Sequence, residues 1–169
     1  MQTIKFRFLT DKEKRELFIL KTTKNDIVDN FTLTLEEIRY IEKFKKPYLK
    51  LGYALQYLFL KNLGYQLHKD IPLEILKYVG EQLGVEDFRI GFYLNNEAAR
   101  RRHFSEIADF LNFSRFKMNS DFEKLTENIA RKFSNNLELT SLFLSELKKM
   151  KIVAPRISTI EDILSKASI

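Results

Sequence analysis

The chain has 169 residues, 44% of them hydrophobic and 31% charged, which is typical of a soluble globular protein with a buried core. It contains no cysteine, and its two histidines lie far apart in the sequence, so disulfides and thiolate zinc sites are excluded. With 29 Lys and Arg against 23 Asp and Glu, the net charge of +6 favours an acidic partner such as nucleic acid.

Two segments bear on the cellular location. The first ten residues, MQTIKFRFLT, carry charges within their apolar run and lack the core of a secretory leader. The longest apolar segment, residues 53–60, is too short to span a bilayer. We therefore expect a cytoplasmic protein with no membrane partner, and the sequence predicts neither a cofactor nor a metal site.

Helix starts are marked along the chain by Ser or Thr three residues before Glu. This is the spacing of a capping box, in which each side chain accepts from a backbone N–H. These boxes begin at Thr10, Thr34, Ser120 and Ser158. The expected helices cover residues 11–19, 35–44, 47–62, 72–83, 97–111, 120–133, 137–150 and 158–166. The polar segment 21–30 is predicted to be a loop, and the alternating residues 4–8 an extended stretch.

The helix expected over residues 47–62 is apolar nearly all round and has one polar stripe. The stripe consists of Lys46, Lys50, Tyr53, Tyr57 and Lys61. A basic stripe with aromatic residues suits contact with phosphates and packing against bases or sugars. Alternatively, Tyr hydroxyls and Lys amines sit at the edge of any buried helix. We favour this second interpretation for the tyrosines but not for the lysines, whose run begins ahead of the helix with Lys43 and Lys45.

Two further segments have the spacing of a helical hairpin. Gly80 and Gly84 in the first, and Ala108 and Asn112 in the second, occupy the close-approach and turn positions. The expected fold is all-α, a bundle of short helices with two helix-turn-helix-like hairpins. Acidic residues after Gly84 argue against deep insertion of that hairpin into a DNA groove. We expect residues 1–66 to form an N-terminal helical DNA-binding subdomain and residues 67–169 a second, helix-turn-helix-like subdomain.

The most basic helix is expected after the N-cap Asn96. Its first turns carry a basic run, and two more cations follow the turn at its end. These residues are Arg100, Arg101, Arg102, His103, Arg115 and Lys117. A nucleic-acid backbone could reach cations at such a helix-turn junction. The alternative, a solvated helix face, stays open because Arg102 could pair with Glu106 four residues on.

Individual members of this run have different expected roles. Arg101 has Ser105 at i+4 and no acidic partner, so it is expected to matter most for DNA affinity. Arg100 shares the face of Phe104 and is expected to stabilise the fold through its aliphatic stem. His103 borders the apolar stripe, and a packing or hydrogen-bonding role is favoured there over direct DNA contact.

Five segments resemble the N-terminal region of replicative transposases of the Tn-three family, which belong to the DDE type. They are residues 31–38 (FTLTLEEI), 51–64 (LGYALQYLFLKNLG), 78–85 (YVGEQLGV), 100–116 (RRRHFSEIADFLNFSRF) and 152–164 (IVAPRISTIEDIL). They follow the family's order and cover nearly the whole chain. The resemblance implies a region that recognises the terminal inverted repeats of a transposon. It also implies that catalysis belongs to an RNase H-like DDE domain, much further along a far longer chain.

We therefore expect a DNA-binding fragment of a transposase, with double-stranded DNA as its partner and with self-association in the full-length protein. The alternative is a helical protein–protein interaction or assembly domain without direct DNA contact. An enzyme is not expected, because acidic pairs such as Glu36–Glu37 lie in first helical turns, where helix capping explains them. The candidate DNA-binding residues are Lys43, Lys45, Lys46, Lys50, Arg100, Arg101, Arg102, His103, Arg115 and Lys117.

Overall fold

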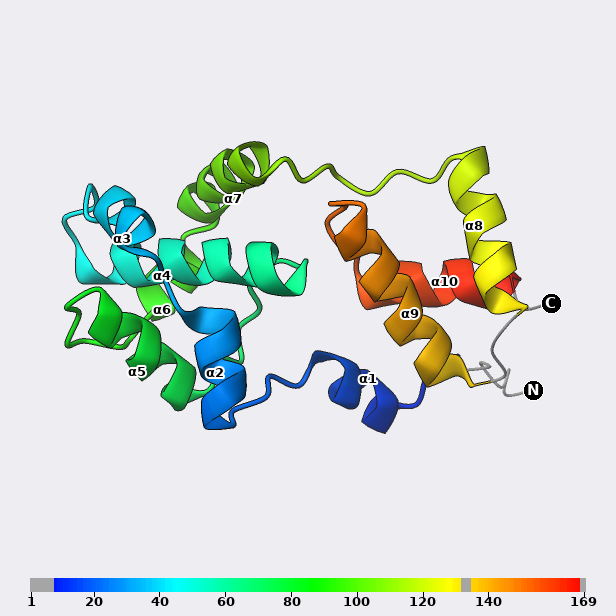
Figure 1. Ribbon diagram of the computed structural model, residues 1–169, viewed down its shortest axis with the longest axis horizontal. Coiled ribbons are helices and arrows are strands. Elements are labelled where there is room, and N and C mark those ends of the chain that lie inside the picture. The colour runs from blue at the N-terminus through cyan, green and yellow to red at the C-terminus, as the bar shows by residue number, and fades with distance from the viewer. Residues whose placement is uncertain (1–7, 132–134, 168–169) are drawn as a thin grey trace. The chain divides into compact units, whose positions relative to one another are not determined.

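The computed structural model describes residues 8–131 and 135–167, and these residues form helices joined by loops (Figure 1). The described elements are α1 (Asp11–Phe18), α2 (Lys24–Phe31), α3 (Leu35–Ile41), α4 (Pro47–Leu58), the π-helical η1 (Phe59–Leu63), α5 (Leu73–Gln82), α6 (Gly91–Asn95), α7 (Glu97–Leu111), α8 (Ser120–Ala130), α9 (Asn136–Lys149) and α10 (Ile157–Ala167). The expected all-α class is confirmed for this part of the chain, which contains no strand. The extended stretch expected over residues 4–8 lies outside it except for Phe8.

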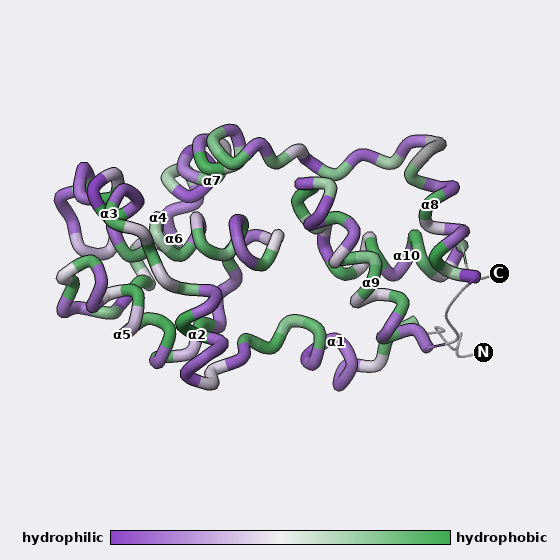
Figure 2. The backbone as a smooth tube through the Cα atoms, in the orientation of Figure 1, coloured by the Kyte–Doolittle hydropathy of each residue, from purple (hydrophilic) through white to green (hydrophobic). Residues whose placement is uncertain are grey.

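The chain divides into two compact units. Residues 20–114 form one unit, and residues 1–19 together with 115–169 form the other. The boundary expected between residues 66 and 67 falls inside the first of these, because α4 packs against α5, α6 and α7. Along most helices the backbone in Figure 2 alternates between hydrophobic and hydrophilic colours, as expected when each helix buries one face.

Helix α4 is the centre of the unit formed by residues 20–114 (Figure 1). Each residue from Leu51 to Leu58 is buried, because α2, α3, α5, α6 and α7 all pack against this helix. Its last turn widens into η1, where Gly64 donates its N–H to the carbonyl of Phe59 at 2.9 Å. Gly64 has φ +80°, a left-handed conformation that ends the helix.

The other unit assembles the beginning of the chain with its last third. Its core consists of Phe8, Leu9, Phe122, Ile129, Leu139, Phe143, Leu147, Ile160 and Leu164. Leu9 is fully buried, and its N–H donates to the Glu161 carboxylate at 3.3 Å. Lys14 of α1 pairs with the same carboxylate at 3.0 Å. The first turns of the chain are therefore part of a core completed by α8, α9 and α10.

Several expected helix ends are confirmed. Thr10 and Thr34 form complete capping boxes, Pro47 occupies the first turn of α4, and Asn96 caps α7 by accepting from the N–H of Ala99 at 3.1 Å. Helix α8 begins at Ser120, but its cap is Asn119, one residue earlier than expected. Helix α10 begins at Ile157, so Ser158 lies within it.

Two expectations about the chain path are wrong. Residues 24–30 of the predicted loop belong to α2, which Thr23 caps by accepting from the N–H of Asp26. The helix expected directly after Gly84 is absent, since residues 85–90 are not helical and α6 starts at Gly91. The turn itself is as expected. The Val85 N–H donates to the carbonyl of Gly80 at 2.8 Å, as the Phe113 N–H does to Ala108 at 2.9 Å. Residues 113–119 are not helical either, so the structure does not show the two hairpins.

None of the helices among the described residues is long and apolar enough to cross a membrane.

Candidate nucleic-acid interface

Three of the candidate lysines lie at the start of α4. Lys45 and Lys46 are exposed, Lys50 is half-buried, and none has an acidic partner among the described residues. Lys46 is the N-cap and its side chain makes no capping hydrogen bond, so side chains leave the first N–H groups of α4 uncapped. Pro47 has no N–H and the Leu49 N–H donates to the Lys46 carbonyl at 3.0 Å, so the Tyr48 N–H and the helix dipole are what favour an anion at this end. The candidate lysines therefore lie next to the N-terminal end of the α4 dipole.

Lys43 has a different environment from these three lysines. Its ammonium lies 2.9 Å from the carboxylate of Glu106, 2.7 Å from the hydroxyl of Tyr40, and 3.8 Å from the centre of the Tyr40 ring. Burial alone would lower the pKa of Lys43, but the hydrogen bonds to Tyr40 and Glu106 raise it. The charge of Lys43 is therefore compensated within the chain, unlike that of Lys46.

The partners of Glu106 correct the expected pairing with Arg102. Glu106 accepts from Tyr40, from Lys43, and from the Tyr53 hydroxyl at 3.2 Å. These hydrogen bonds, the one from Tyr40 first, lower the pKa of Glu106 below its usual value. Because Tyr40 belongs to α3, Tyr53 to α4 and Lys43 to the loop between them, Glu106 of α7 joins three helices. Arg102 is exposed and has no ion pair among the described residues.

The other two arginines of α7 are engaged. Arg101 lies 3.8 Å from the carboxylate of Glu97 at i−4, so the premise that it has no acidic partner is wrong. Both side chains are exposed, which keeps this pair weak. Arg100 donates through Nη1 to the carbonyl of Leu94 at 2.5 Å and so connects α7 to α6. Arg102 is thus the arginine of the run with the most available charge.

His103 is buried, with 5% of its surface exposed, as the packing interpretation expects. Its Nδ1 lies 2.9 Å from the hydroxyl of Tyr93, and Gln56 Nε2 donates to the same hydroxyl at 2.5 Å. The rings of Phe44 and Tyr53 pack at 5.1 and 5.2 Å from the imidazole. Burial, together with the charge of Arg102, lowers the pKa of His103. A neutral, buried imidazole stabilises the fold and is not available as a phosphate ligand.

Two candidates and one further histidine lie elsewhere. Arg115 and Lys117 are exposed and belong to the other compact unit, outside the group formed by α4 and α7. His68, in the loop between η1 and α5, is half-buried against Phe59 and Tyr65, with ring centres at 5.3 and 6.0 Å. Its Nε2 is buried without a hydrogen-bond partner. The described residues contain no group of three or more His, Cys, Asp or Glu that could hold a metal ion.

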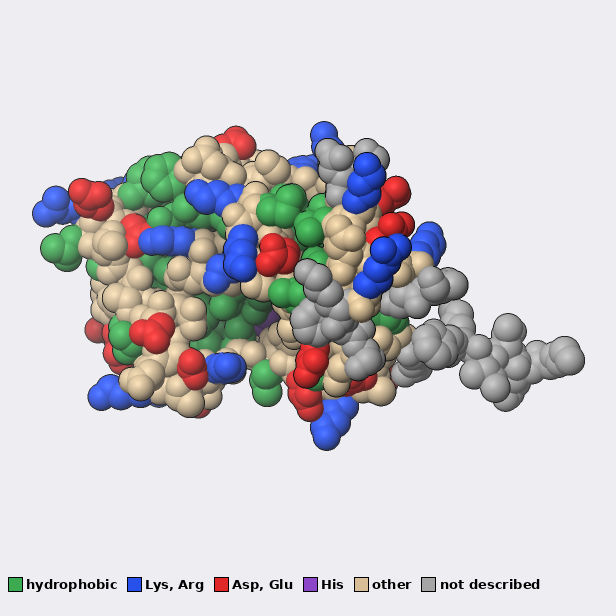
Figure 3. Space-filling model, turned by 45° about the vertical axis from the view of Figure 1, so that its right-hand side comes forward, with side chains coloured by type: hydrophobic (Ala, Val, Ile, Leu, Met, Phe, Trp, Pro, Cys, Tyr) green, Lys and Arg blue, Asp and Glu red, His purple; other side chains and the backbone are tan. Residues whose placement is uncertain are grey.

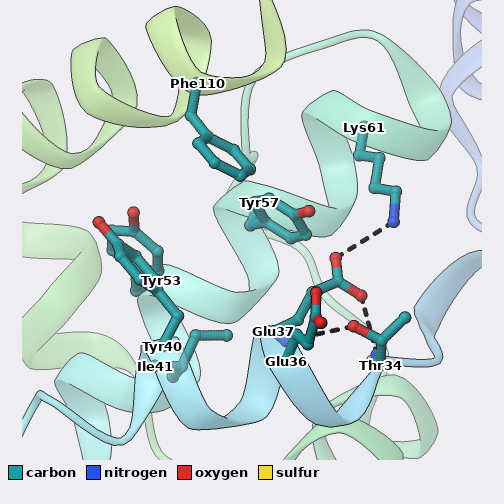
Figure 4. Close-up of a pocket in the computed structure, with 9 residues that line it drawn as sticks. All are labelled: Thr34, Glu36, Glu37, Tyr40, Ile41, Tyr53, Tyr57, Lys61 and Phe110. Atoms are coloured by element: carbon teal, nitrogen blue, oxygen red, sulfur yellow. Dashed lines mark hydrogen bonds and ion pairs between the residues drawn. The ribbon is translucent and has the colours of Figure 1, made fainter.

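A pocket of about 390 Å³ opens between α3, α4 and α7 (Figure 4). Its lining residues are Thr34, Glu36, Glu37, Tyr40, Ile41, Tyr53, Tyr57, Lys61 and Phe110. Figure 4 shows the ring of Phe110 pointing from α7 toward Tyr57, while Lys61 pairs with Glu37 at 3.1 Å. Phe110 was not among the candidate residues predicted from the sequence. Its side chain is 73% exposed, although it follows the buried Ile107 at helical spacing.

A second exposed ring, also missed, lies beside the start of α4. Phe92 of α6 is 80% exposed, and its ring centre lies 5.9 Å from that of Tyr48. The Lys46 ammonium lies 5.8 Å from the centre of the Tyr48 ring. On the face drawn in Figure 3, Lys and Arg are interspersed with Asp and Glu. A candidate polyanion site is therefore better identified from the cations that lack an acidic partner than from the total number of cations on the surface.

The amino-acid sequence of the chain is similar to a protein family and to several curated proteins. Residues 8–167 match the family described as Domain of unknown function (DUF4158). The chain belongs to this family. The DUF4158 chain is also similar to curated transposases, which confirms the resemblance drawn from its motifs.

Three relatives of the DUF4158 chain illustrate the similarity. The transposase for transposon Tn21 from Escherichia coli is 28% identical over 160 residues, covering 90% of the chain and 16% of the relative. The transposase for transposon Tn501 from Pseudomonas aeruginosa is 24% identical over 164 residues, covering 94% and 16%. The transposase for transposon Tn1546 from Enterococcus faecium is 26% identical over 173 residues, covering 99% and 17%. The DUF4158 chain thus spans 16–17% of the length of these relatives.

Proposed function

We propose that this chain is a DNA-binding part of a transposase and that it recognises the terminal inverted repeats of a transposon. The observation that carries this proposal is the similarity of 90% or more of the chain to transposases for Tn21, Tn501 and Tn1546. Because the chain spans only a sixth of such proteins, strand transfer is assigned to the rest of their length and not to these residues.

The affinity of the proposed complex comes from phosphate contacts. Lys45, Lys46 and Lys50 at the start of α4 support this role, because no acidic side chain among the described residues compensates them and they adjoin a helix N-terminus without a side-chain cap. Arg102 supports it on α7. Of the remaining candidates, Lys43, Arg100 and His103 hold the helices of this unit together. Sequence preference requires a helix that reaches base edges, and α7 with its turn at Asn112 is our candidate.

The second candidate function is protein–protein assembly without DNA contact. The observation that favours it is the pocket of Figure 4, which is lined by the exposed Phe110 and Tyr40 rings as well as by Glu36 and Glu37. An apolar opening whose rim carries the carboxylate of Glu36 beside the neutralised Lys61–Glu37 pair suits a protein side chain better than a nucleic-acid backbone. A pocket of this kind is compatible with DNA binding elsewhere on the same unit.

Salt-titrated binding to duplex DNA tests the proposal. The parent protein should bind a terminal inverted-repeat duplex more tightly than a scrambled duplex, with affinity falling steeply as salt rises. A Lys46→Glu/Lys50→Glu protein should bind both duplexes more weakly. Its salt slope should be lower by about two units, one for each phosphate-binding side chain that is replaced.

The matched control reverses two exposed lysines outside the site, Lys21→Glu and Lys24→Glu, which changes the net charge equally. Equal reductions in affinity for the two double variants would mean that net charge alone governs binding. A parent protein that binds neither duplex, or binds both without salt dependence, would refute the proposed function.

A further inference from the structure

Phe92 is an exposed ring on a rigid support. Its neighbour Tyr93 is fully buried and packs over Gly52 of α4, where the absence of a Cβ lets the ring approach. The Tyr93 hydroxyl is held by Gln56 and His103 at 2.5 and 2.9 Å. Helix α6 is therefore fixed on α4, and the 80% exposed side chain of Phe92 is presented to solvent by a backbone that has little freedom to withdraw it.

The immediate surroundings of Phe92 are aromatic and basic. Its ring contacts that of Tyr48 at 5.9 Å, and the Tyr48 ring lies 5.8 Å from the Lys46 ammonium. Lys45 precedes Lys46 and is exposed. No acidic side chain pairs with either lysine in the described part of the chain. We call the group of Phe92, Tyr48, Lys45 and Lys46 the Phe92 surface.

The charge around this ring selects its partner. Phe110, the other strongly exposed Phe of the unit, opens onto a pocket that contains Glu36 and the Lys61–Glu37 ion pair, and it follows the exposed Asp109. An aromatic ring among carboxylates disfavours a polyanion. The Phe92 ring adjoins Tyr48, whose ring lies near the uncompensated Lys46, and this arrangement disfavours a basic peptide but matches a ligand with both negative charge and flat apolar faces. Nucleic acid has this combination, since every base has a face on which an aromatic side chain can stack.

We propose, on the basis of the proposed DNA-binding function, that Phe92 packs against bases of the bound duplex while Lys46 contacts a neighbouring phosphate. Tyr48 supports the Phe92 ring from behind. Apolar side chains that enter a groove in this way partly unstack a base step and increase the contact area of the complex. The Phe92 surface would then add an uncharged component to a binding energy otherwise dominated by phosphates.

An uncharged contact and a phosphate contact differ in their salt dependence. A Phe92→Ala protein should bind inverted-repeat DNA roughly tenfold more weakly at every salt concentration, with the parent's salt slope, because counterion release is unchanged. A Lys46→Ala protein should instead lower the slope by about one unit. Since the Phe92 side chain is exposed, the alanine variant should melt like the parent.

A fluorescent reporter provides a second, independent measurement. The chain has no Trp, so a Phe92→Trp protein carries a single indole, as does the matched control Leu73→Trp, whose side chain is 54% exposed on α5. DNA should quench the emission of the first protein, through stacking on bases, and leave the emission of the second unchanged.

Three results would overturn the inference while the parent binds DNA. The first is a Phe92→Ala protein that binds like the parent. The second is an emission of the Phe92→Trp protein that does not change with DNA, and the third is equal quenching of both indoles. Absence of DNA binding by the parent would refute the proposed function, and this inference with it.

Discussion

Gly52 lies at the closest approach of α4 and α6. A Cβ placed on it would lie 2.3 Å from two carbons of the Tyr93 ring, well inside van der Waals contact. The ring cannot swing aside, because Tyr93 is fully buried and its hydroxyl is bonded to Gln56 and His103. Glycine is therefore required here by packing, although it lowers helix propensity.

Substituting Gly52 should destabilise the fold despite the better helix propensity of alanine. We expect Gly52→Ala to lower the free energy of unfolding by about 1–3 kcal/mol, the usual cost of overpacking a well-packed core. Urea denaturation followed by circular dichroism measures this change. The control is Gly91→Ala in α6, where an added Cβ meets no atom within 4 Å. Equal denaturation midpoints for the two variants would contradict the close packing of Tyr93 on α4.

Single residues also show which parts of the site the sequence could predict. The burial of His103 was predictable, because its spacing to Ile107 places it beside an apolar stripe. Its partner Tyr93 was not, nor was the contact of Glu106 with Tyr40 and Lys43, because these pairs join helices whose packing has no local signature. Phe92 and Phe110 were missed for a related reason. A large apolar residue in a helix is expected inside, and only the packed structure shows that it is exposed.

At the scale of elements, helix ends were predicted best because capping is local. The boxes at Thr10 and Thr34 and the left-handed residue Asn112 each require only neighbouring side chains. Helix α2 was missed because most of residues 21–30 are polar. Its two buried positions, Ile27 and Phe31, are only one turn apart, and its stability comes from packing against α4 and α5.

Three helices meet at the buried polar group formed by Gln56 of α4, Tyr93 of α6 and His103 of α7. Burial lowers the pKa of His103 below its ordinary 6.5, and burial does the same for His68. The unfolded chain then binds a proton more readily than the folded chain. The contribution of each histidine to stability is therefore complete above about pH 6.5 and is lost as the pH falls toward the folded-state pKa.

Stability should therefore fall between pH 7 and pH 5, before most carboxylates titrate. A His103→Gln protein keeps a hydrogen-bonding group near Tyr93 but cannot titrate, so its free energy of unfolding should fall less over this range. The pH dependence that remains in this variant is expected to come from His68. At pH 7 the substitution should cost about 1–3 kcal/mol through imperfect hydrogen bonding. Urea denaturation at a series of pH values measures both the cost at pH 7 and the loss of stability on acidification. If parent and variant lose the same free energy of unfolding between pH 7 and pH 5, folding does not lower the pKa of His103.

At the scale of the whole molecule, one compact unit is continuous in sequence and the other is not. Residues 20–114 carry the start of α4, the arginines of α7 and the Phe92 surface, so both proposals concern the continuous unit. The other unit depends on Phe8 and Leu9, which complete a core built from α8, α9 and α10. The two parts should therefore respond differently to removal of the first turns.

Deleting residues 1–19 should weaken one unit and spare the other. Removing two buried side chains of this size costs about 3–6 kcal/mol, which is a large part of the stability of a small domain. Hydrogen exchange measured by mass spectrometry should show faster exchange in α8, α9 and α10, with α4 protected as in the parent. A Leu9→Ala protein should show the same pattern more weakly, since it removes one side chain only. Equal loss of protection in α4 would contradict the division into two units.

The unit formed by residues 1–19 and 115–169 cannot assemble until its second segment has been synthesised. The ribosome releases residues 8–19 first, but their partners in α9 and α10 emerge only after the whole of residues 20–114. At a synthesis rate of about 5–20 residues per second, α1 remains without its packing partners for seconds, which is long enough for the continuous unit to fold. The continuous unit with the proposed DNA-binding helices thus has time to fold before residues 8–19 pack into their core. During this interval the apolar side chains of Phe8 and Leu9 are a natural substrate for chaperones.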